Sequence, residues 1–160
     1  MSTEDAWRAL AEVNGWIRVA DAKAAALLSL SGLLGGWIVS ALPVERHPGL
    51  RTAILTAGLA MVFGTACLAI RALRPVVWKG PPHSGLHFVD ISRLYASGAA
   101  FAAESAGLMA DGDRLTRELC QQLWVNSTIA TRKFQSVDRA LMLLVPGLAA
   151  TVAALLAEGW

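Results

Sequence analysis

Three long stretches without a charged residue constrain this chain more than any other feature. They cover residues 24–44, 52–70 and 140–157. As helices they would each be roughly 27–31 Å long at a rise of 1.5 Å per residue, which matches a bilayer core of about 30 Å. The whole chain is 55% hydrophobic and only 16% charged, an unusual balance for a soluble domain. We therefore predict a small all-α integral membrane protein with three transmembrane helices.

Basic residues at the edges of these stretches predict the orientation of the chain. Lys23, Arg51, Arg71 and Arg139 lie where long side chains can reach lipid headgroups. If the N-terminus is cytoplasmic, only Arg46 and Arg51 of the 14 Lys and Arg lie outside, as the positive-inside rule requires. We expect a multi-pass protein of the cell inner membrane with a cytoplasmic N-terminus.

The same boundaries divide the chain into successive segments. We predict a cytoplasmic helix extension at 1–23, a first span at 24–44, an outer hairpin at 45–51, a second span at 52–72, a cytoplasmic linker and helical region at 73–139, and a third span at 140–157.

Two of the three spans are predicted to continue as helices beyond the membrane. No proline occurs before Pro43, so a single helix is expected from Glu4 to Leu42. Another helix is expected from Phe88 to about Met109, and a last one from Asp113 into the third span. The extensions of the first and third helices, with one intervening helix, would form a cytoplasmic bundle of about ninety residues. Because that size is marginal for an independent core, we expect a homo-oligomer.

Polar residues recur at helical spacing on the two extensions. Asn14 and Asp21 are seven residues apart with Arg18 between them, and Asn126 and Lys133 repeat this spacing on the last helix. If the two helices pack side by side, these groups meet in one layer. A structural interpretation pairs Asp21 with Lys133 and lets the asparagines fix the register of a small bundle.

A functional interpretation of the same layer is a ligand pocket. Cations would hold a phosphate, and an aromatic side chain would stack on a base. The candidate ligand-binding residues are Asn14, Arg18, Asp21, Lys23, Asn126, Lys133, Phe88 and Trp124.

Small residues within the spans are candidates for close helix packing. Gly32 and Gly36 are two small residues four positions apart in the first span, and Ala60 and Gly64 have the same spacing in the second. Packing within one chain is the simpler interpretation, and a contact between subunits is the alternative.

The chain shows no enzyme signature and no cluster of residues with metal-ligand spacing, so we expect neither catalysis nor a metal or other cofactor. His83 and His87 are close in sequence but have no third ligand near them. The spans lack ionisable residues, which argues against an ion-coupled transporter.

Three motifs resemble the Pycsar effector transmembrane family. They are VNGWIRVADAKA at 13–24, FVDI at 88–91 and KF at 133–134, in the order found there. The first leads directly into a glycine-containing span, and together they cover nearly the whole chain. One departure is the Gly- and Ala-rich segment 96–110, where that family would have a more acidic helix.

This resemblance implies a role in bacterial anti-phage defence. A cognate cyclase would make cyclic CMP or cyclic UMP, and the effector would respond by disrupting the inner membrane and killing the cell. The expected partners are thus the lipid bilayer and a cyclic pyrimidine nucleotide, and not a nucleic acid polymer. A ligand-independent membrane scaffold and a holin-like pore are the alternatives.

Overall fold

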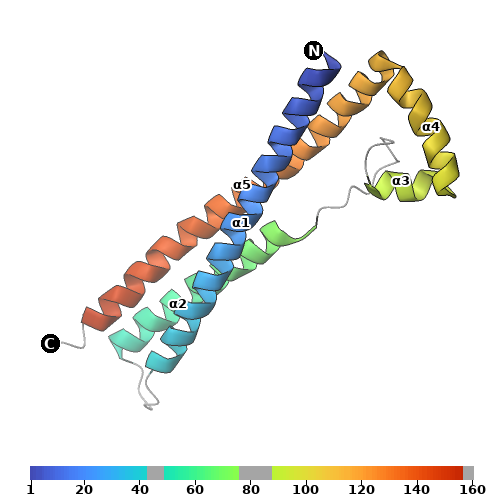
Figure 1. Cartoon of the computed structure of the whole chain (residues 1–160). Coiled ribbons are helices and arrows are strands. Elements are labelled where there is room, and N and C mark those ends of the chain that lie inside the picture. Colours follow the sequence, from blue (N-terminus) through green and yellow to red (C-terminus); the bar gives the residue numbers. More distant parts are fainter. Residues whose placement is uncertain (43–48, 76–87, 157–160) are drawn as a thin grey trace. The chain divides into compact units, whose positions relative to one another are not determined.

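The computed structural model describes residues 1–42, 49–75 and 88–156. Most of the predicted outer hairpin, and both linker histidines, lie outside these residues. The described part is all-helical (Figure 1). Its elements are α1 (Thr3–Ala41), α2 (Leu50–Leu73), α3 (Phe88–Leu94), α4 (Gly98–Ala110) and α5 (Gly112–Leu156).

Helix α1 is continuous over 39 residues, as the absence of proline predicts. A capping box starts it: the Asp5 amide donates to Ser2 Oγ at 3.1 Å, and the Ser2 amide and hydroxyl both donate to Asp5 Oδ2. These hydrogen bonds from Ser2 lower the pKa of the Asp5 carboxyl below its usual 3.8. A carboxylate in the first turn also interacts favourably with the helix dipole.

The predicted single helix between Phe88 and Met109 is divided into α3 and α4, which corrects the expectation of one intervening helix. Ser97 breaks the helix. It has an extended backbone and its hydroxyl accepts a hydrogen bond from the Ala100 amide at 3.2 Å, so it serves as the N-cap of α4. Tyr95 and Phe101 meet edge to face across the break, with ring centroids 5.3 Å apart.

Helix α5 runs for 45 residues and passes through Pro146. Asp111 caps its first turn by accepting from the Arg114 amide at 2.9 Å. Pro146 has no amide hydrogen to donate into the preceding turn. One turn later the Thr151 hydroxyl donates to the Gly147 carbonyl at 2.8 Å.

The chain divides into two compact units. Unit 1 comprises Met1–Arg18 and Pro75–Thr131, and unit 2 comprises Val19–Arg74 and Arg132–Trp160. Helices α1 and α5 therefore each contribute a segment to both units. Unit 1 has a small apolar core formed by Ala6, Leu10, Leu108, Leu115 and Leu119.

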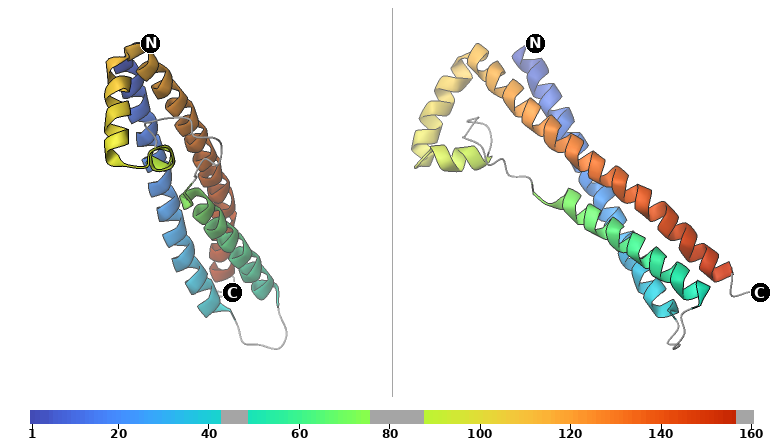
Figure 2. Two further views of the ribbon diagram at one scale, coloured as in Figure 1. Left: turned by 90° about the vertical axis from the view of Figure 1, so that its right-hand side faces the viewer. Right: turned by 180° about the vertical axis from the view of Figure 1, so that it is seen from behind.

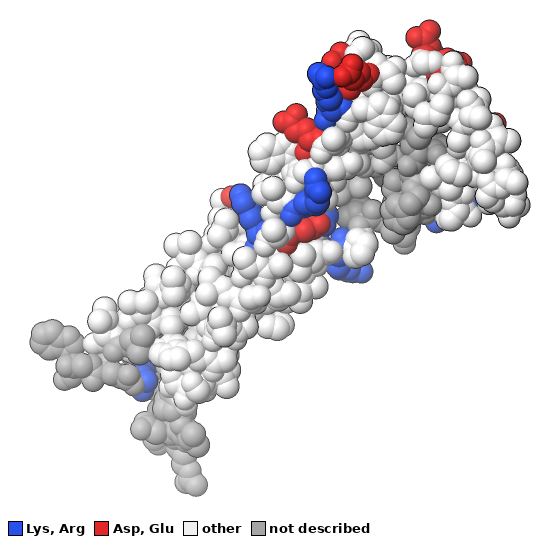
Figure 3. All heavy atoms as spheres, viewed as in Figure 1, with Lys and Arg blue, Asp and Glu red and all other residues white. Residues whose placement is uncertain are grey.

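Unit 2 contains the apolar parts of α1, α2 and α5, which lie beside one another in both views of Figure 2. Each of these three helices is long and apolar enough to cross a membrane. One core cluster includes Ala24, Ala69, Val137 and Ala140, and another is centred on Leu55. Most of the face of unit 2 seen in Figure 3 carries no charged side chain. This arrangement is that of a multi-pass membrane protein.

Candidate ligand site

A polar network joins α1 and α5 inside unit 1. The Asn126 amide nitrogen donates to the Asn14 side-chain oxygen at 2.7 Å, and Gln122 donates to Asn126 at 2.9 Å. Thr3 and Thr116 form a further hydroxyl contact of 2.7 Å between the same two helices. The structure thus brings Asn14 and Asn126 together. Each such neutral bond contributes about 0.5–1.5 kcal/mol, and its directionality fixes the register of the pair.

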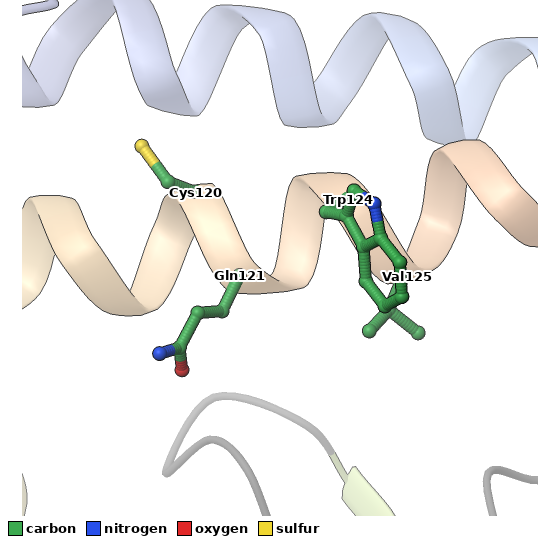
Figure 4. Close-up of a pocket in the computed structure, with 4 residues that line it drawn as sticks. All are labelled: Cys120, Gln121, Trp124 and Val125. Carbon is green, nitrogen blue, oxygen red and sulfur yellow. The ribbon is translucent and has the colours of Figure 1, made fainter.

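A cavity of about 390 Å³ lies against α5 in unit 1, lined by Cys120, Gln121, Trp124 and Val125 (Figure 4). In this close-up Gln121 and Val125 extend from the same side of the helix. The volume falls within the range of small-molecule pockets, about 300–1,000 Å³. The Trp124 side chain is 62% exposed, which leaves aromatic surface accessible to a ligand. An amide beside an aromatic ring can offer both a hydrogen bond and a stacking surface to a planar heterocycle.

Two other sequence candidates occupy unit 1. Arg18 is exposed on α1, four residues after Asn14. Phe88 is the first residue of α3, and its side chain lies outside the described part of the structure.

Lys133 occupies unit 2 and is buried, with an exposed fraction of 7%. Its ammonium group donates to Asp21 Oδ1 of α1 at 2.5 Å and to the Ala72 carbonyl oxygen of α2 at 2.7 Å. Ala72 is in the last turn of α2, where carbonyl groups lack helical partners and a cation interacts favourably with the helix dipole. Lys133 of α5 therefore contacts α1 through one hydrogen bond and α2 through the other.

This arrangement favours the structural interpretation of Asp21 and Lys133. Two of the three ammonium donors are used within the chain, and the side chain is largely removed from solvent. The Asp21 side chain is 39% exposed, so the pair is only partly buried, but a phosphate would still have to replace an interaction that Lys133 already makes. Lys23 stays exposed, with its ammonium group 5.6 Å from the centroid of the Phe134 ring.

The glycines that make close helix contacts differ from those expected in the first span. Gly32 and Gly36 are exposed, and a Cβ on either would meet nothing within 4 Å. The structure shows no close contact within the chain at these two positions, whereas Gly35 faces α2, where an added Cβ would lie 3.8 Å from Val62. The direction in which a glycine faces depends on the rotation of the helix about its axis, which sequence spacing alone does not fix.

In the second span, Ala60 is exposed and Gly64 faces Leu143 of α5. The backbones of α2 and α5 lie close together where Gly58 meets Gly147. A Cβ on Gly58 would lie 3.4 Å from the Gly147 carbonyl oxygen, and one on Gly147 would lie 3.5 Å from the Gly58 carbonyl oxygen.

Sequence reasoning also missed three groups near the candidate sites. Gln122 could have been found, because it lies four residues before Asn126 on the same helix face. Gln121 had no distinguishing signal, and the Ala72 carbonyl is a backbone group that no side-chain pattern reveals. Within the described residues no three His, Cys, Asp or Glu side chains are grouped to hold a metal ion.

Comparisons with known proteins agree with the motifs. The family model described as the Pycsar effector protein domain matches residues 5–158. The Pycsar effector protein PtPycTM of Propioniciclava tarda is 25% identical over 167 residues, which cover 99% of this chain and 82% of that protein. No solved structure matches the chain. With its three candidate membrane helices, this chain belongs to the Pycsar effector family.

Proposed function

We propose that a cyclic pyrimidine nucleotide, cUMP or cCMP, binds unit 1 of this Pycsar anti-phage membrane effector and triggers disruption of the inner membrane. The observation that carries the proposal is the cavity beside Trp124 and Gln121 on α5. A pyrimidine base would stack on the indole and hydrogen-bond to the amide. Arg18, exposed on the neighbouring helix of unit 1, is the candidate cation for the phosphate.

The continuity of α1 and α5 supports a route from ligand to membrane. Each is a single helix that contributes one segment to unit 1 and another to unit 2. A nucleotide that binds one arrangement of unit 1 more tightly shifts the equilibrium towards it. About 1.4 kcal/mol of differential affinity gives a tenfold shift, so a few polar contacts and one stacked base are sufficient.

The orientation and assembly belong to the same proposal. The distribution of basic residues supports a cytoplasmic location for unit 1 and the N-terminus, where a soluble nucleotide would be made. At most 33% of the apolar window of any candidate span is buried in a single chain, so ample helix surface remains for a homo-oligomer in the bilayer.

Dye efflux from liposomes carrying the purified protein tests the trigger. We expect efflux on addition of cUMP or cCMP, and none with cyclic AMP. Efflux that is constant and independent of nucleotide would identify a holin-like pore. Folded, inserted protein that never responds would identify a scaffold and refute the proposal.

A matched pair of tryptophan variants tests the site. Trp124→Ala should weaken nucleotide binding about 5- to 150-fold, because a stacked base contributes about 1–3 kcal/mol. Trp7→Ala is the control, since Trp7 is also exposed in unit 1 but does not line the cavity. Calorimetry on detergent-solubilised protein measures both. Equal affinities for the two variants would exclude stacking on Trp124.

A further inference from the structure

In unit 2 the Lys133 side chain of α5 makes polar contacts with both α1 and α2. Its ammonium group contacts the Asp21 carboxylate at 2.5 Å and the Ala72 carbonyl at 2.7 Å. We call these three groups the Lys133 clasp. All three belong to unit 2, within which α2 lies beside α1 and α5 (Figure 2).

The hydrogen bond from Lys133 to the Ala72 carbonyl goes beyond a simple salt bridge between α1 and α5. It satisfies a carbonyl in the last turn of α2 and places a positive charge at the negative end of that helix dipole. Asp21 neutralises the same ammonium group from α1. Because Lys133 has an exposed fraction of only 7%, moving α2 away from α5 would break its hydrogen bond to the Ala72 carbonyl at a position largely removed from solvent.

The apolar cluster around the clasp combines small and large residues, with Leu27, Val137 and Leu144 buried beside four alanines. Ala24, Ala69, Ala72 and Ala140 are buried in the cluster at this level of unit 2. In a bilayer no hydrophobic effect drives helices together, so close packing and polar contacts between helices determine how they associate. A directional polar contact therefore has a large share in determining which arrangement of the three helices is preferred.

We propose that the Lys133 clasp holds the membrane helices in the resting arrangement and that releasing Ala72 and Asp21 from Lys133 is the step that lets them rearrange. Lys133 is then a positioning residue for membrane disruption and does not bind the nucleotide. The inference rests on the proposed membrane activity and requires no particular nucleotide.

Basal dye efflux from liposomes tests this inference without any nucleotide. Lys133→Met retains an unbranched side chain but removes the donor, and we expect its basal efflux to be at least about tenfold above wild type, equivalent to about 1.4 kcal/mol. The control is Arg132→Met, which removes an exposed basic side chain adjacent to Lys133 in the sequence and should leave basal efflux unchanged. Circular dichroism verifies that both variants retain their helices.

Basal efflux of Lys133→Met equal to wild type would overturn the inference. A wild-type response to cUMP or cCMP in that same experiment would leave the proposed function intact. Conversely, a leaking variant beside a wild type that ignores every nucleotide would support the clasp and refute the proposed trigger.

Two further variants keep the test decisive. If Lys133→Met does not insert, Asp21→Leu is tested instead, because leucine is close in size to aspartate but has no oxygen to accept a hydrogen bond from the Lys133 ammonium group. Leakage supports the clasp, and basal efflux equal to wild type overturns it. The exchanged pair Asp21→Lys with Lys133→Asp restores the ion pair but cannot donate from position 133 to the Ala72 carbonyl. We expect basal dye efflux from this double variant to exceed that of wild type. Efflux equal to wild type would show that the contact with the Ala72 carbonyl of α2 is not needed to hold the resting arrangement.

Discussion

Units 1 and 2 are built from the same two long helices, yet different forces hold them together. Unit 1 packs five apolar residues, among them Leu10, Leu108 and Leu119, and adds polar contacts such as Asn126 to Asn14. Unit 2 relies on close backbone contacts at glycine, such as Gly58 with Gly147. In water, burial of apolar area drives association, whereas in lipid close packing must replace it.

The exposed surfaces of the two units follow the same distinction. In unit 2 large apolar side chains point outwards, including Phe63, Met142 and Val145, each at least 65% exposed. Such residues face lipid at no cost in a membrane helix. Unit 1 also exposes some large apolar side chains, such as Trp124, but it adds exposed ion pairs, such as Arg114 with Glu104 at 2.6 Å. That contact raises the pKa of Arg114. One helix can therefore serve two environments if its side chains change along its length.

The largest expected effect tests whether apolar burial stabilises unit 1. Leu119 is fully buried, so Leu119→Ala should destabilise the protein by about 2–5 kcal/mol through lost burial and a residual cavity. Hydrogen exchange in detergent should show the loss in α4 and the start of α5. Leu94→Ala, at a position 48% exposed, is the control. Similar exchange in both variants would contradict a hydrophobic core in unit 1.

The next effect tests close packing in unit 2. Gly58→Leu would force side-chain atoms beyond a Cβ that already lies 3.4 Å from the Gly147 carbonyl oxygen, at a cost of about 1–3 kcal/mol. Gly36→Leu is the matched control, because a Cβ there meets nothing within 4 Å. Thermal unfolding in detergent compares them. Equal loss of thermal stability in both variants would contradict a specific close contact between α2 and α5 at Gly58. A change of oligomeric state in Gly36→Leu alone would place Gly36 in a contact between subunits.

A smaller effect tests the polar network of unit 1. Asn14→Ala removes the acceptor for Asn126 and should cost about 1 kcal/mol. Asn14→Asp retains an acceptor oxygen and should recover most of that loss. Thermal unfolding measures both variants. Equal stability of Asn14→Ala and wild type would mean that water replaces this bond without penalty.

The smallest effect concerns the first turn of α1. Because its hydrogen bonds with Ser2 lower the pKa of Asp5, the carboxylate stabilises the folded state above the ordinary pKa of 3.8. That stabilisation is lost as the pH falls through the lower pKa of the folded state. An NMR titration should give a midpoint below 3.8 for Asp5, and Asp5→Asn should remove the acid dependence of amide protection in this turn. A midpoint at or above 3.8 would contradict the capping box.

The sequence determined the three apolar spans, the continuity of α1 and α5 and the facing polar residues on them. These features are local: a span needs about 20 apolar residues, and residues seven apart share a helix face in any context. The pairs Asn14–Asn126 and Asp21–Lys133 were expected as one alternative for that reason, and the structure joins both. The division between α3 and α4 was missed because the cap at Ser97 was outweighed by the helix-forming alanines around it.

Only the tertiary structure decided which groups are buried and which remain free to act. Lys133 and Lys23 look alike in sequence, but the first is enclosed by α1 and α2 while the second stays exposed. Gly35, and not Gly32 or Gly36, approaches α2, and the Ala72 carbonyl becomes a partner only because α5 lies beside the end of α2. The physical reason is that burial depends on how each helix is rotated and placed against its neighbours, which no spacing within one helix can specify.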